Sequence, residues 1–167
     1  VTRTAKFLDD VKNLGYYQAF RAGISFNLGD VLIPEEKEGL IQNGYKTVEE
    51  HKNNFLMGFL TDRERYNKVV DLWTSIDNKL TGIVEKNISS ADQGFNPVWM
   101  MLDSGARGST QQIKQLCGMR GLMAKPQKSG ATGTDVIENP VISNLMEGMS
   151  VLEYFVSTHG ARKGLAD

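Results

Sequence analysis

The chain has 167 residues, a formal net charge of −1 and a single cysteine, Cys117. This length suffices for one ordinary domain with a core, and the near-neutral charge gives no overall signature of nucleic-acid binding. The lone cysteine excludes an internal disulfide and a multi-cysteine zinc site, and no apolar run is long enough to predict a membrane span.

Two features of the chain ends set further expectations. The sequence begins at Val1 rather than Met, and it stops at Asp167 inside a helix-like pattern with no terminating signal. We therefore expect a piece of a longer polypeptide. No signal-peptide pattern opens it, which favours a cytoplasmic protein without a membrane partner.

The first elements are a helix and an irregular connection. Apolar residues at near-helical spacing predict a helix over Ala5–Arg21. The segment Gly23–Pro34 has alternating apolar residues interrupted by Gly29-Asp30, which favours a turn with short extended segments.

The next elements form a predicted antiparallel helical hairpin over about 35–87. A polar helix over Glu35–Met57 is ended by Gly58, although Gly39 and Gly44 weaken it. Thr61 and Glu64 have capping-box spacing and begin the second helix. Its apolar face consists of Tyr66, Val69, Val70, Trp73, Ile76, Leu80 and Ile83. Narrow apolar stripes bury little area, so we expect an arm that projects from a body.

A linker over Asn87–Pro97 and a buried apolar run over Val98–Leu102 precede a basic stretch, Asp103–Lys128. No carboxylate lies between Asp103 and Asp135, whereas the stretch contains Arg107, Lys114, Arg120, Lys125 and Lys128. Cations with glycine-rich backbone suit phosphate oxygens, and a solvated basic loop is the alternative. Ser109 or Thr110 can cap a short helix through Cys117, which places Arg107 before a helix N-terminus that favours anions.

The last element is a predicted helix that begins with a Ser150 and Glu153 capping box. Leu152, Phe155, Val156 and Leu165 are its expected packing residues. Gly160 and Gly164 each cost about 1 kcal/mol in a helix interior, so this helix is expected to be closely packed or to bend. No carboxylate or cysteine cluster accompanies His159, which favours an ordinary hydrogen-bonded histidine over a general acid or a metal ligand.

Four motifs carry a family resemblance. They are ERYNKVVDLW (Glu64–Trp73), DSGARGS (Asp103–Ser109), GMRGLMAKP (Gly118–Pro126) and EYFVSTHGARKGLAD (Glu153–Asp167). In this order and at this spacing, the chain resembles the largest catalytic subunit of bacterial multisubunit RNA polymerase, the beta-prime subunit, from about Ala5 to Asp167.

The resemblance implies a mainly α fold with two regions. Residues 1–88 would form the funnel, or secondary-channel region, with the hairpin as its rim helices. Residues 89–167 would form an irregular helical lobe with an F-loop-like segment over Met119–Ile142 and the N-terminal half of the bridge helix.

The resemblance also implies sites. Regulatory and transcript-cleavage factors would dock on hairpin residues Glu64, Arg65, Asn67, Lys68 and Asp71. Positions near nucleotide or nucleic acid would be Arg107, Lys114, Thr158, His159, Arg162 and Lys163, with Gly160 and Gly164 as hinges. Lys114 replaces an arginine of many relatives, and Leu145 and Met146 stand where relatives usually carry Phe and a basic residue.

The implied reaction is nucleotidyl transfer, in which two Mg²⁺ ions stabilise the attacking and leaving oxygens. The family binds these ions through an aspartate cluster that this sequence lacks, so we expect no catalytic or metal-binding residue here and no polymerisation by the piece alone. Implied partners are the beta, alpha, omega and sigma subunits, template DNA, RNA, nucleoside triphosphates and secondary-channel factors, in the nucleoid-associated bacterial cytoplasm.

Two alternatives remain open from the residues. One is a free-standing helical module that binds partners through its hairpin. The other is a small phosphate- or nucleotide-binding regulatory module built on Gly105–Lys128.

Overall fold

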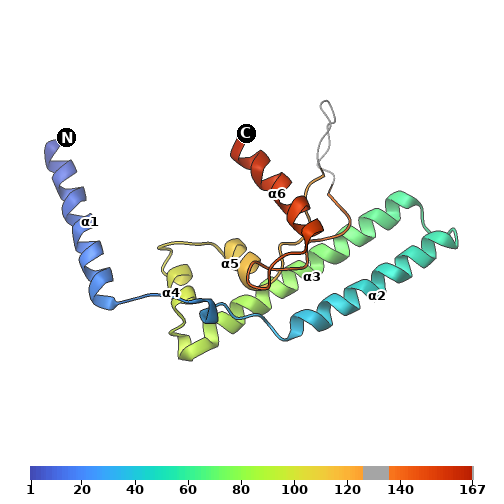
Figure 1. Cartoon of the computed structure of the whole chain (residues 1–167), viewed down its shortest axis with the longest axis horizontal. Helices are drawn as coiled ribbons and strands as arrows, with labels where there is room; N and C mark the ends of the chain where they lie inside the picture. The colour runs from blue at the N-terminus through green and yellow to red at the C-terminus, as the bar shows by residue number, and fades with distance from the viewer. Residues whose placement is uncertain (126–135, 167) are drawn as a thin grey trace.

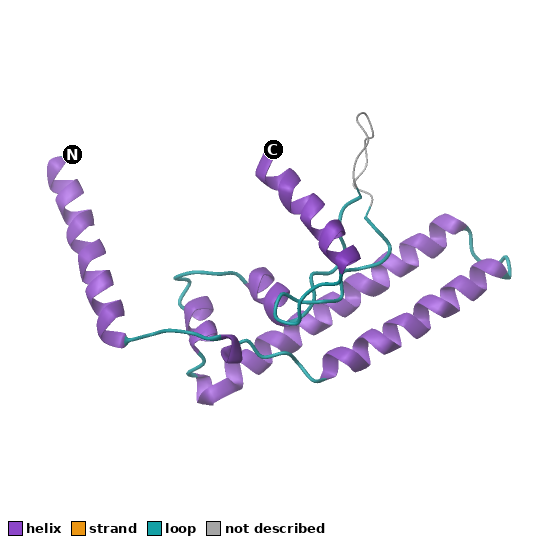
Figure 2. Ribbon diagram, viewed as in Figure 1, coloured by secondary structure: helices purple, strands orange, loops and turns teal. Residues whose placement is uncertain are grey.

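The computed structural model describes residues 1–125 and 136–166, with side chains through Arg162 (Figures 1 and 2). In these residues the secondary structure is helical, with two isolated bridges (Gly121 with Val141, Ala124 with Val136) in place of strands. The elements are α1 (Thr2–Ala22), η1 (Leu28–Asp30), α2 (Glu36–Leu56), α3 (Asp62–Ser90), η2 (Ala91–Gly94), α4 (Pro97–Asp103), α5 (Thr110–Cys117) and α6 (Val151–Ala166). The prediction of a mainly α chain is confirmed.

Helices α2 and α3 lie side by side and run in opposite directions (Figure 1). The capping box forms as the sequence indicates, because Thr61 Oγ1 accepts from Glu64 N while the Glu64 carboxylate accepts from Thr61 N. At 1.5 Å per residue, α3 is about 43 Å long. It continues to Ser90, so the linker expected from Asn87 begins only after that residue.

The two hairpin helices lie in close contact at Gly44. A Cβ atom at this position would lie 2.7 Å from Ile76 Cδ1 and 3.1 Å from the Trp73 ring, whereas Gly39 has open space around it. The neighbouring Tyr45 ring meets Trp73 edge-on, with the ring centroids 5.3 Å apart. Gly44 therefore does not merely weaken α2, because its missing side chain makes room for α3.

The hydrophobic core follows one face of α3. Its buried residues on that helix are Val69, Trp73, Ile76, Leu80, Val84 and Ile88. The cluster is completed by Val31 after η1, Val98 of α4, Ile113 and Cys117 of α5, and Met119. Burial raises the pKa of the Cys117 thiol to about 11, as befits a cysteine that acts as a small apolar residue. Residues on both sides of position 88 share this core, and the division into regions 1–88 and 89–167 stays a prediction.

The first helix stands apart from this core (Figure 1). None of its residues is buried, and the apolar side chains Phe7, Leu8 and Val11 are more than half exposed. The connection after it contains η1, capped by Asn27, in place of the short extended segments expected over residues 23–34.

Helix α6 also departs from the expectation of close packing. Leu152 is 80 % exposed and Phe155 is 62 % exposed, whereas Ser157 is buried. Outside its own stretch of helix, no described residue places an atom within 4 Å of a Cβ built at Gly160, and the helix continues through this position. Within the described residues, Gly160 is therefore not explained by a close contact, and its role as a hinge stays a prediction.

Candidate functional site

Arg107 lies on a tight loop between α4 and α5. Gly105 (φ 69°) and Gly108 (φ 93°) on either side of it adopt left-handed backbone that side chains disfavour. Ser109 then caps α5 reciprocally with Gln112, since each side chain accepts a hydrogen bond from the other's backbone N–H. Arg107 is exposed, and its guanidinium makes no hydrogen bond or ion pair with any residue that the structure describes.

A hollow of about 390 Å³ opens beside Arg107. Its lining is mainly apolar and includes Phe26, Val31, Val98, Met101, Leu116 and Leu145. The arrangement thus presents one guanidinium at the edge of an apolar hollow. That suits a single contact to an anion, and further groups would be needed to enclose a triphosphate.

Lys114 is engaged in an ion pair within the fold. Its expected place near nucleotide stays a prediction. Lys114 is only 6 % exposed, and its Nζ lies 2.7 Å from Oδ2 of Asp77 on α3. The other Asp77 oxygen, Oδ1, is buried without a hydrogen-bond partner among the described residues. The pair therefore joins α5 to the hairpin.

Other cations of the basic stretch also have partners within the fold. Arg120 Nε donates to Gln115 Oε1 at 3.2 Å, and Lys125 Nζ lies 5.0 Å from the centre of the Tyr66 ring. Lys128 lies outside the described residues. The sequence predicts a phosphate-binding surface over Asp103–Lys128. In the described part of this stretch, Arg107 is the exposed cation without a side-chain partner.

The expected docking residues of the hairpin fall into two groups. Asn67, Lys68 and Asp71 are exposed. Glu64 is engaged in the capping box, where hydrogen bonds from the Thr61 backbone and hydroxyl lower the pKa of its carboxyl.

Arg65 belongs to an internal ion-pair network. Its guanidinium donates two hydrogen bonds to Glu138, at 2.7 and 3.0 Å, and two to Asp62, at 2.9 and 3.2 Å. These bonds from Arg65 lower the pKa of the Glu138 carboxyl. The Tyr66 hydroxyl beside it donates to Val136 O and accepts from Val136 N. Arg65 thus joins residues 136–138 to the hairpin. Its expected part in the docking of factors stays a prediction.

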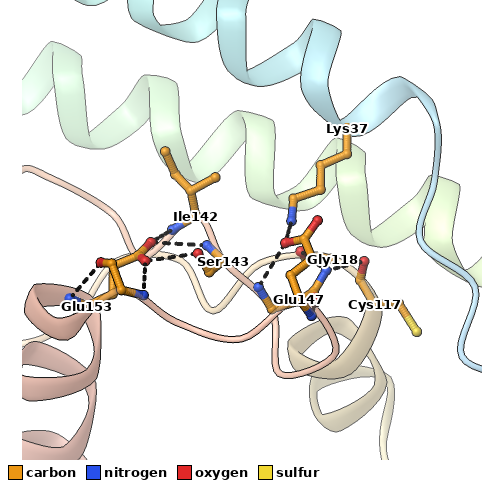
Figure 3. Close-up of polar contacts among 9 residues, drawn as sticks. Lys37, Cys117, Gly118, Ile142, Ser143, Glu147 and Glu153 are labelled. Atoms are coloured by element: carbon orange, nitrogen blue, oxygen red, sulfur yellow. Dashed lines mark hydrogen bonds and ion pairs between the residues drawn. The ribbon is translucent and has the colours of Figure 1, made fainter. Parts of the chain in front are cut away.

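A polar network at the base of α6 was not anticipated from the sequence (Figure 3). Asn144 is fully buried, and its amide donates to Cys117 O at 3.1 Å and Gly118 O at 3.2 Å. Its Oδ1 accepts from Glu147 N at 2.7 Å, and the Glu147 carboxylate forms an ion pair with the buried Lys37 of α2. Asparagine in a loop carries no periodic signal, so only the structure shows this role.

Glu153 fastens the first turn of α6 to the same loop. Its carboxylate accepts from Ser150 N, completing the predicted capping box, and from Ile142 N, Ser143 N and Ser143 Oγ (Figure 3). Desolvation by burial acts to raise the pKa of Glu153. The hydrogen bonds from Ser150 and Ser143 outweigh it and lower the pKa to about 2.

This depressed pKa predicts an acid-sensitive contribution to stability. Because the folded-state pKa lies below the ordinary value of 4.5, the stabilisation by Glu153 is fully present above that pH and is lost as the pH falls toward about 2. We expect the difference in free energy of unfolding between the parent and Glu153→Gln to shrink across this window, measured by urea denaturation at a series of pH values. A difference that stays constant with pH would contradict the assignment.

The remaining predicted site residues lie on α6. His159 and Arg162 are exposed and line, with Ala124 and Ile137, a hollow of about 350 Å³. Thr158 Oγ1 donates to Phe155 O within the helix. The side chain of Lys163 and the surroundings of Gly164 lie outside what the structure describes. Within that set, no cluster of three or more His, Cys, Asp or Glu side chains could bind a metal ion.

Comparison with known proteins places these features in a family. The model of the family "RNA polymerase Rpb1, domain 4" matches residues 60–146, which include the second hairpin helix, the Arg107 loop, Lys114 and Asn144. The chain belongs to this family. No helix in the part of the chain that the structure describes has both the length and the apolar character needed to cross a membrane.

Relatives from several bacteria match the whole chain. The DNA-directed RNA polymerase subunit beta′ of Bacteroides fragilis is 66 % identical over 167 residues, that of Parabacteroides distasonis 63 % and that of Flavobacterium johnsoniae 60 %. The chain spans 12 % of the length of each of these relatives. It therefore corresponds to a segment of the beta′ subunit, and the resemblance carried by the four motifs is confirmed.

Proposed function

We propose that this segment serves DNA-directed RNA synthesis as part of a beta′ subunit, where it lines the route by which nucleoside triphosphates reach the active site and braces the elements around that site. The identity of 60 % to 66 % with beta′ subunits along the whole of this chain supports the setting. The observation that carries the role is Arg107, whose guanidinium has no partner among the described residues and is exposed on a tight loop beside an open hollow. A rigid fork of donors suits a passing phosphate.

The other elements take roles in the same proposal. The exposed Asn67, Lys68 and Asp71 on the hairpin would meet secondary-channel regulatory factors. Helix α6 would be the beginning of the bridge helix, with Thr158, His159, Arg162 and Lys163 near nucleic acid and Gly160 and Gly164 as hinges. The exposed apolar side chains of α1 and α6 support burial against the rest of the polymerase, including its beta, alpha, omega and sigma subunits.

The metal chemistry is proposed to lie elsewhere in the whole enzyme. Two Mg²⁺ ions would stabilise the attacking and leaving oxygens there. The described residues offer no carboxylate cluster that fits such a pair, so we assign this segment no step at the metals and expect it not to polymerise alone. A free-standing adaptor or regulatory module is disfavoured because the relatives carry this segment within a much longer chain.

Nucleotide kinetics test the role of Arg107. In polymerase assembled with Arg107→Ala, we expect the apparent KM for nucleoside triphosphates to rise about tenfold, because one charge-assisted hydrogen bond is lost. Arg107→Lys keeps the charge without the fork and should fall between parent and Ala variant. Lys46→Ala, at an exposed position on α2, is the matched control and should leave KM unchanged. A KM for Arg107→Ala within about twofold of the parent would contradict the proposal.

A further inference from the structure

The loop between residues 141 and 150 is fastened to two separate elements. On one side, Asn144 fixes it to the end of α5 through Cys117 O and Gly118 O, and Leu145 N donates to Gln115 O at 3.0 Å. On the other side, Glu147 reaches across to Lys37, which belongs to the first turn of α2 (Figure 3). The base of the hairpin is thus connected to this loop by one ion pair.

The same loop is also connected rigidly to α6. Glu153 accepts hydrogen bonds from Ile142 N and Ser143 N and caps its own helix with Ser150 (Figure 3). Only Gly148 and Met149 separate Glu147 from the capping residue Ser150. Because this connection is so short, a movement of Glu147 is expected to move the first turn of α6 as well.

The two partners of the ion pair differ in exposure, which makes the connection breakable. The Lys37 side chain is 7 % exposed, so its ammonium depends on Glu147 for compensation. The Glu147 side chain is 39 % exposed and can exchange this contact for water. A small hollow lined by Lys37, Glu38, Ile41, Ile142 and Glu147 lies beside the pair. The loop can therefore separate from α2 at this point while Asn144 still anchors it to α5.

From these contacts we infer that Lys37 is a positioning residue for α6. Through Glu147 it fixes the loop from which α6 begins, so a displacement of the hairpin base is transmitted to the start of that helix. The coupling passes through one charge pair, Lys37 with Glu147, and one buried asparagine, Asn144.

Hydrogen exchange in the assembled polymerase tests the coupling directly. Lys37→Met removes the charge and keeps the apolar stem, and Glu147→Gln removes the other charge at a partly exposed position that tolerates change. We expect backbone amides of residues 150–156 to exchange about fivefold faster or more in each variant. The double variant should equal the singles, because both changes break one contact. Lys46→Met, on the exposed side of α2, should match the parent.

Elongation kinetics then test whether the position of α6 matters to the reaction. This second experiment rests on the proposed function. Lys37→Met should lower the maximal elongation rate and leave the apparent KM for nucleotides unchanged, the opposite pattern to Arg107→Ala. Parent-like exchange in both single variants, additive effects in the double variant, or equal acceleration in Lys46→Met would each overturn the coupling. Accelerated exchange with unchanged elongation would overturn its role in the reaction. If Arg107→Ala left the KM for nucleotides unchanged, the hydrogen-exchange evidence for the coupling would not be affected.

Discussion

Replacing Trp73 by Ala is expected to lower the free energy of unfolding of the chain by about 3–5 kcal/mol, the largest loss we anticipate for a single residue. Trp73 is 2 % exposed and lies at the centre of the core face of α3. Gly44 and Tyr45 pack against it from α2. The cavity left by the indole cannot close readily, because moving α2 inward would bring its backbone against the side chain of Ile76.

Urea denaturation followed by circular dichroism measures this loss. Trp99→Ala is the matched control, because Trp99 is the other tryptophan of the chain and is only partly buried at the edge of the core. Trp99→Ala should lower the free energy of unfolding by clearly less than Trp73→Ala does. Equal losses for the two variants, or a loss below about 1 kcal/mol for Trp73→Ala, would show that the core is not centred on α3.

Lys114→Met should destabilise the fold by about 3 kcal/mol, at the lower end of the range for breaking a buried ion pair. The substitution leaves the Asp77 carboxylate without its cation, and one of its oxygens already lacks a partner within the described residues. The Asp77 side chain is 21 % exposed, so water compensates part of the cost.

A double-mutant cycle separates this pair from simple loss of packing. Asp77→Asn combined with Lys114→Met should recover most of the lost stability, because no unpaired charge is then buried. Purely additive losses would mean that the pair contributes nothing. Lys46→Met, which removes an exposed lysine from α2, should change the stability by no more than about 0.5 kcal/mol.

The sequence carried enough local information to predict the hairpin. The Thr61 and Glu64 capping box and the terminating Gly58 act over a few residues, and the apolar face of α3 recurs at helical spacing. The caps at Ser109 and Ser150 were predictable for the same reason. Such signals depend on neighbours along the chain, which the sequence displays directly.

The sequence could not reveal which side chains contact each other when they lie far apart in the chain. From the sequence, Lys114 looks like one more cation of a basic stretch, yet its partner carboxylate belongs to Asp77, which lies 37 positions away on α3. From the sequence, Arg65 looks like a surface residue of the hairpin, yet its guanidinium donates to the carboxylate of Glu138, which lies 73 positions away in the chain. Gly44 reads as a weak point of α2 because sequence spacing does not reveal which glycine faces another helix. These long-range pairs decide which cations stay accessible to a ligand, and Arg107 is among the exposed ones.

The most direct test of the central claim is labelling of the assembled polymerase by a nucleoside triphosphate that carries a photoreactive group on its γ-phosphate. If this segment lines the nucleotide route, the label should appear in the peptide Asp103–Gln112, should decrease with added unmodified nucleotide, and should decrease in Arg107→Ala. Labelling confined to other parts of the enzyme, with this peptide unmodified, would contradict the claim.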